Sequence, residues 1–134
     1  MSNFELQIVT PDGVLYSGNA NKIILRTTEG DVGILPRHSD YVAPLSIGLA
    51  RVFTEGKERT AACSGGMATV SDGVVRVVAS TFEWSEDIDV ARAKKARERA
   101  MSRLEGAKSS DFEYRLAEIK LKKSLARLGA AERK

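Results

Sequence analysis

Hydrophobic and polar positions follow two different periods along the chain. Up to about residue 85, short segments rich in β-branched residues alternate between apolar and polar positions, a period of two that is typical of strands. The segments predicted as strands are residues 4–9, 22–27, 50–54 and 74–80. Turn-forming sequences separate them, namely Pro11-Asp12-Gly13, Glu29-Gly30, Glu55-Gly56 and Ser71-Asp72-Gly73. Regular turns between short strands predict an all-β sandwich or barrel.

After residue 85 the chain changes to Ala, Arg, Lys, Glu and Leu, which are strong helix formers. This composition predicts a first helix over about residues 89–104, with Asp87 or Asp89 as its N-cap. Residues 106–109 interrupt the helical pattern. We therefore expect a second helix after this break.

The second helix is predicted to begin at Ser110, because Glu113 three residues later completes a capping-box pattern. It is expected to end near Leu128, with Gly129 as its C-terminal cap. Apolar residues recur every three or four positions on it: Tyr114, Ala117, Leu121, Leu125 and Leu128. The first helix offers a facing seam of Ala93, Ala96, Ala100, Met101 and Leu104.

The two helices are expected to form an antiparallel hairpin, because the link between them is short. The predicted fold is therefore α+β: an N-terminal antiparallel β-sandwich, residues 1–85, followed by a C-terminal helical hairpin, residues 86–134. The hairpin alone is too thin for a core. It must dock on the sandwich, dock on a partner, or alternate between the two.

Charge is divided between these two parts. Residues 1–88 contain 7 Lys/Arg and 11 Asp/Glu, whereas residues 89–134 contain 14 Lys/Arg and 7 Asp/Glu. A surface dominated by one sign of charge attracts partners of the opposite sign. The division of charge therefore suggests two modules with different electrostatic partners.

Several function classes lack support in the sequence. No apolar run approaches the roughly 20 residues of a membrane-spanning helix, and no signal sequence is evident, so we expect a soluble, cytoplasmic protein. The single Cys63 is expected to be a buried small residue, and the single His38 an ordinary loop residue without metal ligands. Neither Ser64 nor Ser71 has the partners of a nucleophilic triad. No phosphate-loop motif of a hydrolysing nucleotide site occurs.

Four short motifs, taken in order, resemble one family. They are VTPDG at residues 9–13, GILPRH at residues 33–38, SGG at residues 64–66 and IDVARA at residues 88–93. Together with the order of sandwich and hairpin, they resemble the ε subunit of bacterial F-type ATP synthase over the whole chain. In the second motif, Arg37 stands where that family usually has glycine.

The motif at residues 88–93 resembles the I/L-D-x-x-R-A sequence associated with ATP binding in such subunits. Asp89 can accept a hydrogen bond from an adenine amino group, and Arg92 one turn later reaches the same side. Without the resemblance, these two residues are better explained as an N-cap and an ordinary ion pair. The resemblance implies that the ATP site consists of Glu83, Ile88, Asp89, Arg92, Ala93, Arg99, Lys123 and Arg127. Lys123 stands where an arginine is typical, and a lysine lacks the two-pronged guanidinium.

The resemblance also implies a regulatory role. ATP would be a bound effector that is not hydrolysed, with no metal required, and the chain would be a non-catalytic stalk subunit that inhibits ATP hydrolysis through its helices. The implied partners are the γ subunit, the c-ring, and the catalytic β and α subunits, at the cytoplasmic face of the bacterial membrane. Contacts are expected from Glu29, Gly30, Asp31 and His38. The alternative is a basic hairpin that binds nucleic acid, although only Phe112 and Tyr114 could stack on bases there.

Overall fold

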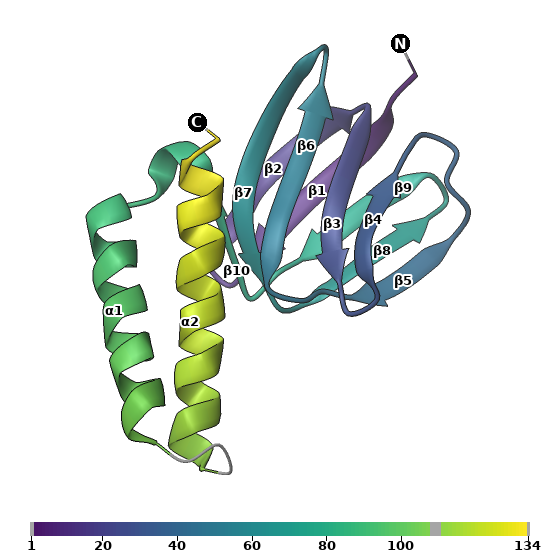
Figure 1. The fold of residues 1–134 in the computed structure, drawn as a ribbon. Helices are drawn as coiled ribbons and strands as arrows, with labels where there is room; N and C mark the ends of the chain where they lie inside the picture. The colour runs from purple at the N-terminus through teal and green to yellow at the C-terminus, as the bar shows by residue number, and fades with distance from the viewer. Residues whose placement is uncertain (1, 108–110, 134) are drawn as a thin grey trace.

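The computed structural model describes residues 2–107 and 111–133. Two five-stranded sheets pack face to face, and a two-helix hairpin lies beside them (Figure 1). The predicted fold class, a β-sandwich followed by a helical hairpin, is confirmed.

The first sheet has the strand order β2-β1-β9-β8-β5. Its strands are β2 (Gly13–Ala20), β1 (Phe4–Thr10), β9 (Val74–Val78), β8 (Met67–Ser71) and β5 (Tyr41–Pro44). The pair β1–β9 is parallel, with Leu6 opposite Val75, whereas the other pairs are antiparallel. The expectation of wholly antiparallel strands therefore fails at this one pair, where two strands far apart in sequence meet.

The second sheet has the order β10-β7-β6-β3-β4 and is antiparallel throughout. Its strands are β10 (Thr81–Trp84), β7 (Lys57–Ser64), β6 (Gly48–Thr54), β3 (Lys22–Thr27) and β4 (Gly30–Ile34). The expected turns Glu55-Gly56 and Asp72-Gly73 each join two strands with positive φ at both residues. This geometry matches the twist of a two-residue hairpin.

The sandwich core is largely aliphatic. Fully buried side chains alternate with outward ones along β1 and β3, and they come from both sheets: Leu6, Ile8, Ile23, Leu25, Val52, Val75 and Val77. Aromatic rings close one end, where Trp84 packs edge-on against Phe82 and Tyr16. Cys63 is buried in this core, as expected.

Strand β7 is buried on both faces. Its residues from Thr60 to Ser64 are all buried, with Ala61 and Cys63 in the sandwich core and Ala62 in a second apolar cluster under the hairpin. Small side chains on this strand let a helix approach the outer face of the sheet. The docking surface of the hairpin is thus built into β7.

The hairpin consists of α1 (Val90–Gly106) and α2 (Phe112–Ala131), preceded by the short 3₁₀ helix η1 (Ser85–Asp87). Asp89 is the N-cap of α1, and its side chain accepts a hydrogen bond from the Arg92 backbone N–H, as predicted. None of the described helices is long and apolar enough to cross a membrane.

The end of α2 differs from the prediction. Gly129 is not a cap, because the helix continues through it to Ala131 and the C-cap is Glu132. A Cβ atom at Gly129 would lie 4.0 Å from Leu49 Cδ2, so this turn of the helix is close to strand β6. At the other end, Asp111 precedes the first helical residue, and the predicted cap Ser110 lies outside the described residues.

The hairpin is docked on the sandwich through α2, and α1 packs on α2 (Figure 1). Ala126, Ala130 and Ala131 of α2 meet Leu49, Ala62 and Ile88 in the second apolar cluster. The expected seam between the helices is confirmed at Ala93, Ala100 and Ala117, which are buried. Met101 and Leu125 were expected in it but are 48% and 49% exposed, and on α2 the buried residue is Ser124 and not Leu125.

Candidate functional site

A cleft of about 380 Å³ lies where β10 meets the two helices. Its volume falls within the usual range of small-ligand sites. Three elements line it: Glu83 from β10; the N-cap residue Asp89 with Arg92, Ala93, Ala96, Arg99, Ala100 and Arg103 from α1; and Lys120, Lys123 and Arg127 from α2.

The lining is strongly basic. It contains six arginine or lysine side chains and two carboxylates. Arg127 Nε lies 3.1 Å from Glu83 Oε1, which links α2 to strand β10. Within residues 2–107 and 111–133, none of the other five lining cations, Arg92, Arg99, Arg103, Lys120 and Lys123, has a carboxylate within ion-pair distance. An excess of cations around a concave surface creates a site for an anion.

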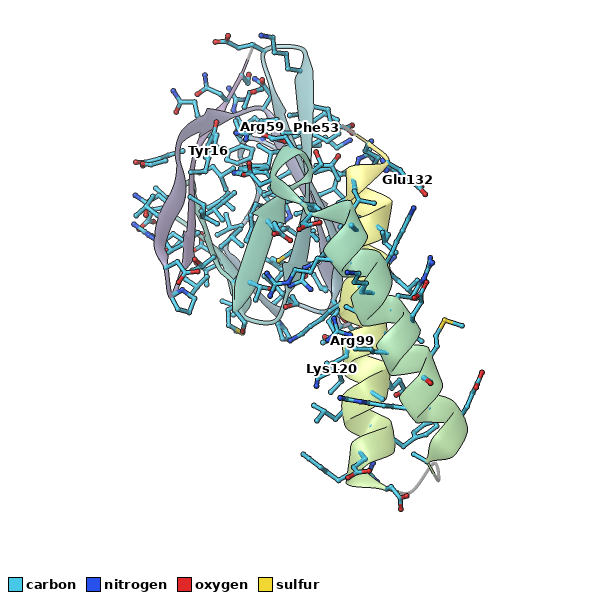
Figure 2. The ribbon with its side chains drawn as sticks, turned by 90° about the vertical axis from the view of Figure 1, so that its left-hand side faces the viewer. Tyr16, Phe53, Arg59, Arg99, Lys120 and Glu132 are labelled. Atoms are coloured by element: carbon cyan, nitrogen blue, oxygen red, sulfur yellow. The ribbon has the colours of Figure 1, made fainter. Side chains whose placement is uncertain are left out.

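Helical spacing explains how α1 presents its share of the cleft. Arg92, Arg99 and Arg103 recur at intervals of seven and four residues, so they share one face of the helix. Ala93, Ala96 and Ala100 lie on the same face and leave the floor of the cleft open. Figure 2 shows Arg99 of α1 and Lys120 of α2 close together on the side of the hairpin below the sandwich.

Asp89 is both the N-cap of α1 and a residue that lines the cleft. One carboxylate oxygen, Oδ1, accepts the Arg92 backbone N–H at 3.0 Å and caps the helix. A carboxylate has a second oxygen that can accept further hydrogen bonds, and Asp89 lines the cleft. The N-cap and a ligand contact are therefore compatible in this geometry.

Seven of the eight residues expected to bind ATP line this single cleft: Glu83, Asp89, Arg92, Ala93, Arg99, Lys123 and Arg127. Ile88 does not line it, because its side chain is 5% exposed and packs against Ala62 and Ala130. The sequence reasoning missed Arg103 and Lys120. Both could have been found from spacing, since Arg103 is one turn beyond Arg99 and Lys120 is one turn before Lys123.

The residues expected to contact partners do not form one patch. Glu29 lies in the turn before β4, Gly30 is the first residue of that strand, and Asp31 next to it makes a 3.0 Å ion pair with Arg26. His38 lies in the loop after β4, where its ring packs edge-on against Tyr41 and its Nδ1–H donates to the Ser39 carbonyl oxygen. Because β4 lies between them, these are two separate surfaces at opposite ends of one strand (Figure 1).

Comparison with known families decides what kind of chain this is. The sequence model for the β-sandwich domain of the ATP synthase delta/epsilon chain matches residues 3–85, and the model for its long α-helix domain matches residues 86–132. The chain belongs to the ATP synthase delta/epsilon chain family. The predicted resemblance to ε subunits is confirmed.

Individual relatives support this membership along the whole chain. The ATP synthase epsilon chain of Ruminococcus albus is 40% identical, with 100% of both chains covered. That of Halalkalibacterium halodurans is 39% identical over 99% of this chain and 100% of its own. A chain in the mitochondrial ATP synthase of Euglena gracilis, solved with OSCP, F1 and the c-ring, superposes with a TM-score of 0.84 at 30% identity, covering 98% of this chain and 82% of that one.

Proposed function

We propose that this delta/epsilon family member is a non-catalytic ε subunit of the central stalk whose hairpin senses ATP. ATP binds in the cleft between β10, α1 and α2 without being hydrolysed, and it stabilises the docked hairpin. The observation that carries this proposal is the gathering of six cations and two carboxylates around one cleft that three separate elements form.

The arrangement of charge supports a nucleoside triphosphate as the ligand. Guanidinium and ammonium groups bind phosphate oxygens, with arginine able to contact two at once. The two carboxylates, Glu83 and Asp89, offer acceptors for the amino group of a base. The alanine floor leaves space for a flat ring.

The cleft depends on the docked conformation. Glu83 is on the sandwich, whereas the other lining residues are divided between α1 with its N-cap and α2, so undocking removes Glu83 from the cleft and extension of the two helices takes the cleft apart. A ligand shifts a two-state equilibrium through its difference in affinity for the two states. ATP would therefore favour the docked hairpin over an extended one.

Released helices supply the inhibitory half of the proposal. The released helices would extend along the γ subunit. Their excess of Lys and Arg would engage an acidic segment of the catalytic β subunit, and this contact would arrest ATP hydrolysis. The turn at Glu29–Asp31 and the loop at His38 would contact γ and the c-ring from two ends of β4. The subunit would be peripheral, at the cytoplasmic face of the bacterial membrane and held there by the complex.

Calorimetric titration of the isolated chain with ATP tests the binding site. The parent should bind ATP with no release of phosphate. Arg92→Ala should weaken binding at least about tenfold, since a hydrogen bond to a charged group contributes about 1.5 to 3 kcal/mol. Lys123→Arg should tighten it, because the planar guanidinium can hold two phosphate oxygens.

Asp89 needs a matched pair of variants because it also caps α1. Asp89→Ala removes the cap and the acceptor together, whereas Asp89→Asn keeps an oxygen for the Arg92 N–H and removes only the carboxylate. Weakened ATP binding in both variants supports a ligand contact. Unchanged affinity in Asp89→Asn and in Arg92→Ala would reject the proposed site.

A further inference from the structure

Two cations in the cleft lie beyond the set that the family motif suggests. Arg103 of α1 and Lys120 of α2 both line the same cavity as Arg99 and Lys123. They come from opposite helices, so they do not merely continue one exposed basic stripe. Their place in the cavity puts them within reach of a ligand bound there.

The cleft has a chemical direction. Both of its carboxylates, Glu83 and Asp89, are at the sandwich end, on β10 and at the start of α1. The helices are antiparallel, so α1 from Arg92 to Arg103 and α2 from Arg127 back to Lys120 both lead away from the sandwich (Figure 1). At 1.5 Å per residue these runs are about 16 Å and about 10 Å long.

Along this direction, the charge of the residues that line the cleft changes from mixed to purely positive. Arg127 at the sandwich end is paired with Glu83, whereas Arg103 and Lys120 have no carboxylate within ion-pair distance among the described residues. Like charges brought together across two helices repel each other and destabilise the docked hairpin. A polyanion that reached this end would remove that repulsion.

We propose that Arg103 and Lys120 form a distal phosphate subsite that binds the terminal phosphate of a nucleoside triphosphate. The inference rests on the proposed function, and it assigns the orientation of the ligand. The base lies toward Glu83 and Asp89, and the phosphate chain runs toward the tip of the hairpin. The subsite also compensates for Lys123, since two further cations assist a residue that contacts phosphate with only one ammonium group.

The number of phosphates that the cleft holds should depend on this pair. A diphosphate bound in the same orientation would end short of Arg103 and Lys120. Neutralising either residue should therefore weaken ATP binding roughly five- to tenfold, the loss of one exposed charge-assisted contact, and ADP binding by less than about twofold. The ratio of the two affinities is the quantity to measure.

The experiment compares Arg103→Gln and Lys120→Gln with Lys94→Gln and Lys122→Gln by titration calorimetry. Lys94 and Lys122 are exposed on the same two helices but do not line the cleft, so the controls remove the same charge from the same elements. ATP, ADP, inorganic tripolyphosphate and pyrophosphate are the ligands. Circular dichroism checks that all four variants keep their helices.

Loss of preference for ATP over ADP in the two cleft variants, with both controls like the parent, is the expected result. The same ratio in cleft variants and controls would overturn the distal subsite while leaving ATP binding intact. If the parent bound no ATP but bound tripolyphosphate, and the cleft variants weakened it, the proposed function would fail and the subsite would stand. Equal weakening by all four substitutions would mean that only net charge matters and would overturn the subsite.

Discussion

Arg37 occupies a backbone conformation that residues other than glycine adopt at an energetic cost. Its φ is 66°, in the left-handed region, within the turn that His38 closes by donating its backbone N–H to the Leu35 carbonyl oxygen. Glycine reaches this region without a steric penalty, whereas a side chain raises the energy by about 1 to 2 kcal/mol. The geometry therefore favours glycine over other residues at this position.

Replacing Arg37 with glycine should stabilise the sandwich. The strain that is relieved exceeds the added freedom of the unfolded chain, so the free energy of unfolding should rise by about 0.5 to 1 kcal/mol. Urea denaturation measures it. Ser39→Gly is a matched control in the same loop, because Ser39 is not at positive φ, and it should lower stability. A loss of stability in Arg37→Gly would contradict the strain.

Cys63 should behave as an unreactive thiol in the folded protein. Burial raises the pKa of Cys63 to about 12, so the thiolate that reacts with alkylating reagents is scarce near neutral pH. Iodoacetamide at pH 8 should modify the folded chain roughly 100-fold more slowly, or slower still, than the chain unfolded in guanidinium. Similar rates in both states would show that the strand opens easily around this residue.

The same pKa has a consequence for stability. The folded state favours the neutral thiol, so its contribution is complete below the unfolded thiol pKa of 9.0 and is lost as pH rises toward 12. The free energy of unfolding can be measured against pH above 8 for the parent and for Cys63→Ala. The difference between the two curves isolates the contribution of the thiol, because Lys and Tyr titrate equally in both proteins.

Strands with a regular alternation of apolar and polar residues could be predicted from the sequence, whereas strands without that alternation could not. The strands at residues 22–27 and 50–54 were found because their apolar residues alternate and are β-branched. Strand β7 was missed because its run of small residues, buried on both faces, has no period of two. Strand β4 contains two glycines and β5 ends in proline, and both compositions weaken a strand signal.

The candidate site was predictable only in part, for a related reason. The family resemblance predicted eight ATP-binding residues, among them Glu83 and residues of both helices. The structure brings seven of the eight to one cleft. Residues that act through tertiary packing could not be read from the sequence. Ile88 is drawn into the apolar cluster, and Ser124 replaces Leu125 at the inner face because of how α2 is rotated against β7.

Helix α2 offers a test of how closely it is docked. Gly129 is in the helix interior, where alanine is favoured over glycine by about 1 kcal/mol, and an added Cβ would make an ordinary contact with Leu49. Gly129→Ala should therefore raise the melting temperature. Gly106→Ala, at the open end of α1 where a Cβ meets nothing within 4 Å, should have a smaller effect. Destabilisation by Gly129→Ala would place α2 closer to β6 than described.

In the whole molecule, charge is divided between the sandwich and the hairpin, and the proposed function gives each of these two parts its own role. The sandwich carries the acidic excess and the closed core, whereas the hairpin carries the basic excess and is held by one small apolar cluster and the Arg127–Glu83 pair. Both side chains of that pair are more than a third exposed, so it contributes at most about 1 kcal/mol. In the proposed function, the hairpin is therefore the part that would be released.

Replacing four cations of α2 with glutamine at the same time should relieve inhibition of ATP hydrolysis in the assembled enzyme when no ATP is bound to the hairpin. The four residues are Lys120, Lys122, Lys123 and Arg127. The arrested state would lose its complementary charges, so hydrolysis should rise toward the rate obtained with residues 1–85 alone, and added salt should partly reproduce this. The truncated chain should unfold cooperatively, since its core lies within the sandwich. Full inhibition by the substituted subunit would exclude electrostatic latching.

The most direct test of the central claim, that ATP binds the docked hairpin, is amide hydrogen exchange of the isolated chain with and without ATP. At an ATP concentration of 100 Kd, exchange that requires undocking should slow by up to about 100-fold in α1, α2 and strand β10, with little change in the distant strands β5 and β8. Asp89→Asn should shift this protection to higher ATP concentrations. Unchanged or faster exchange in both helices at saturating ATP would contradict the account.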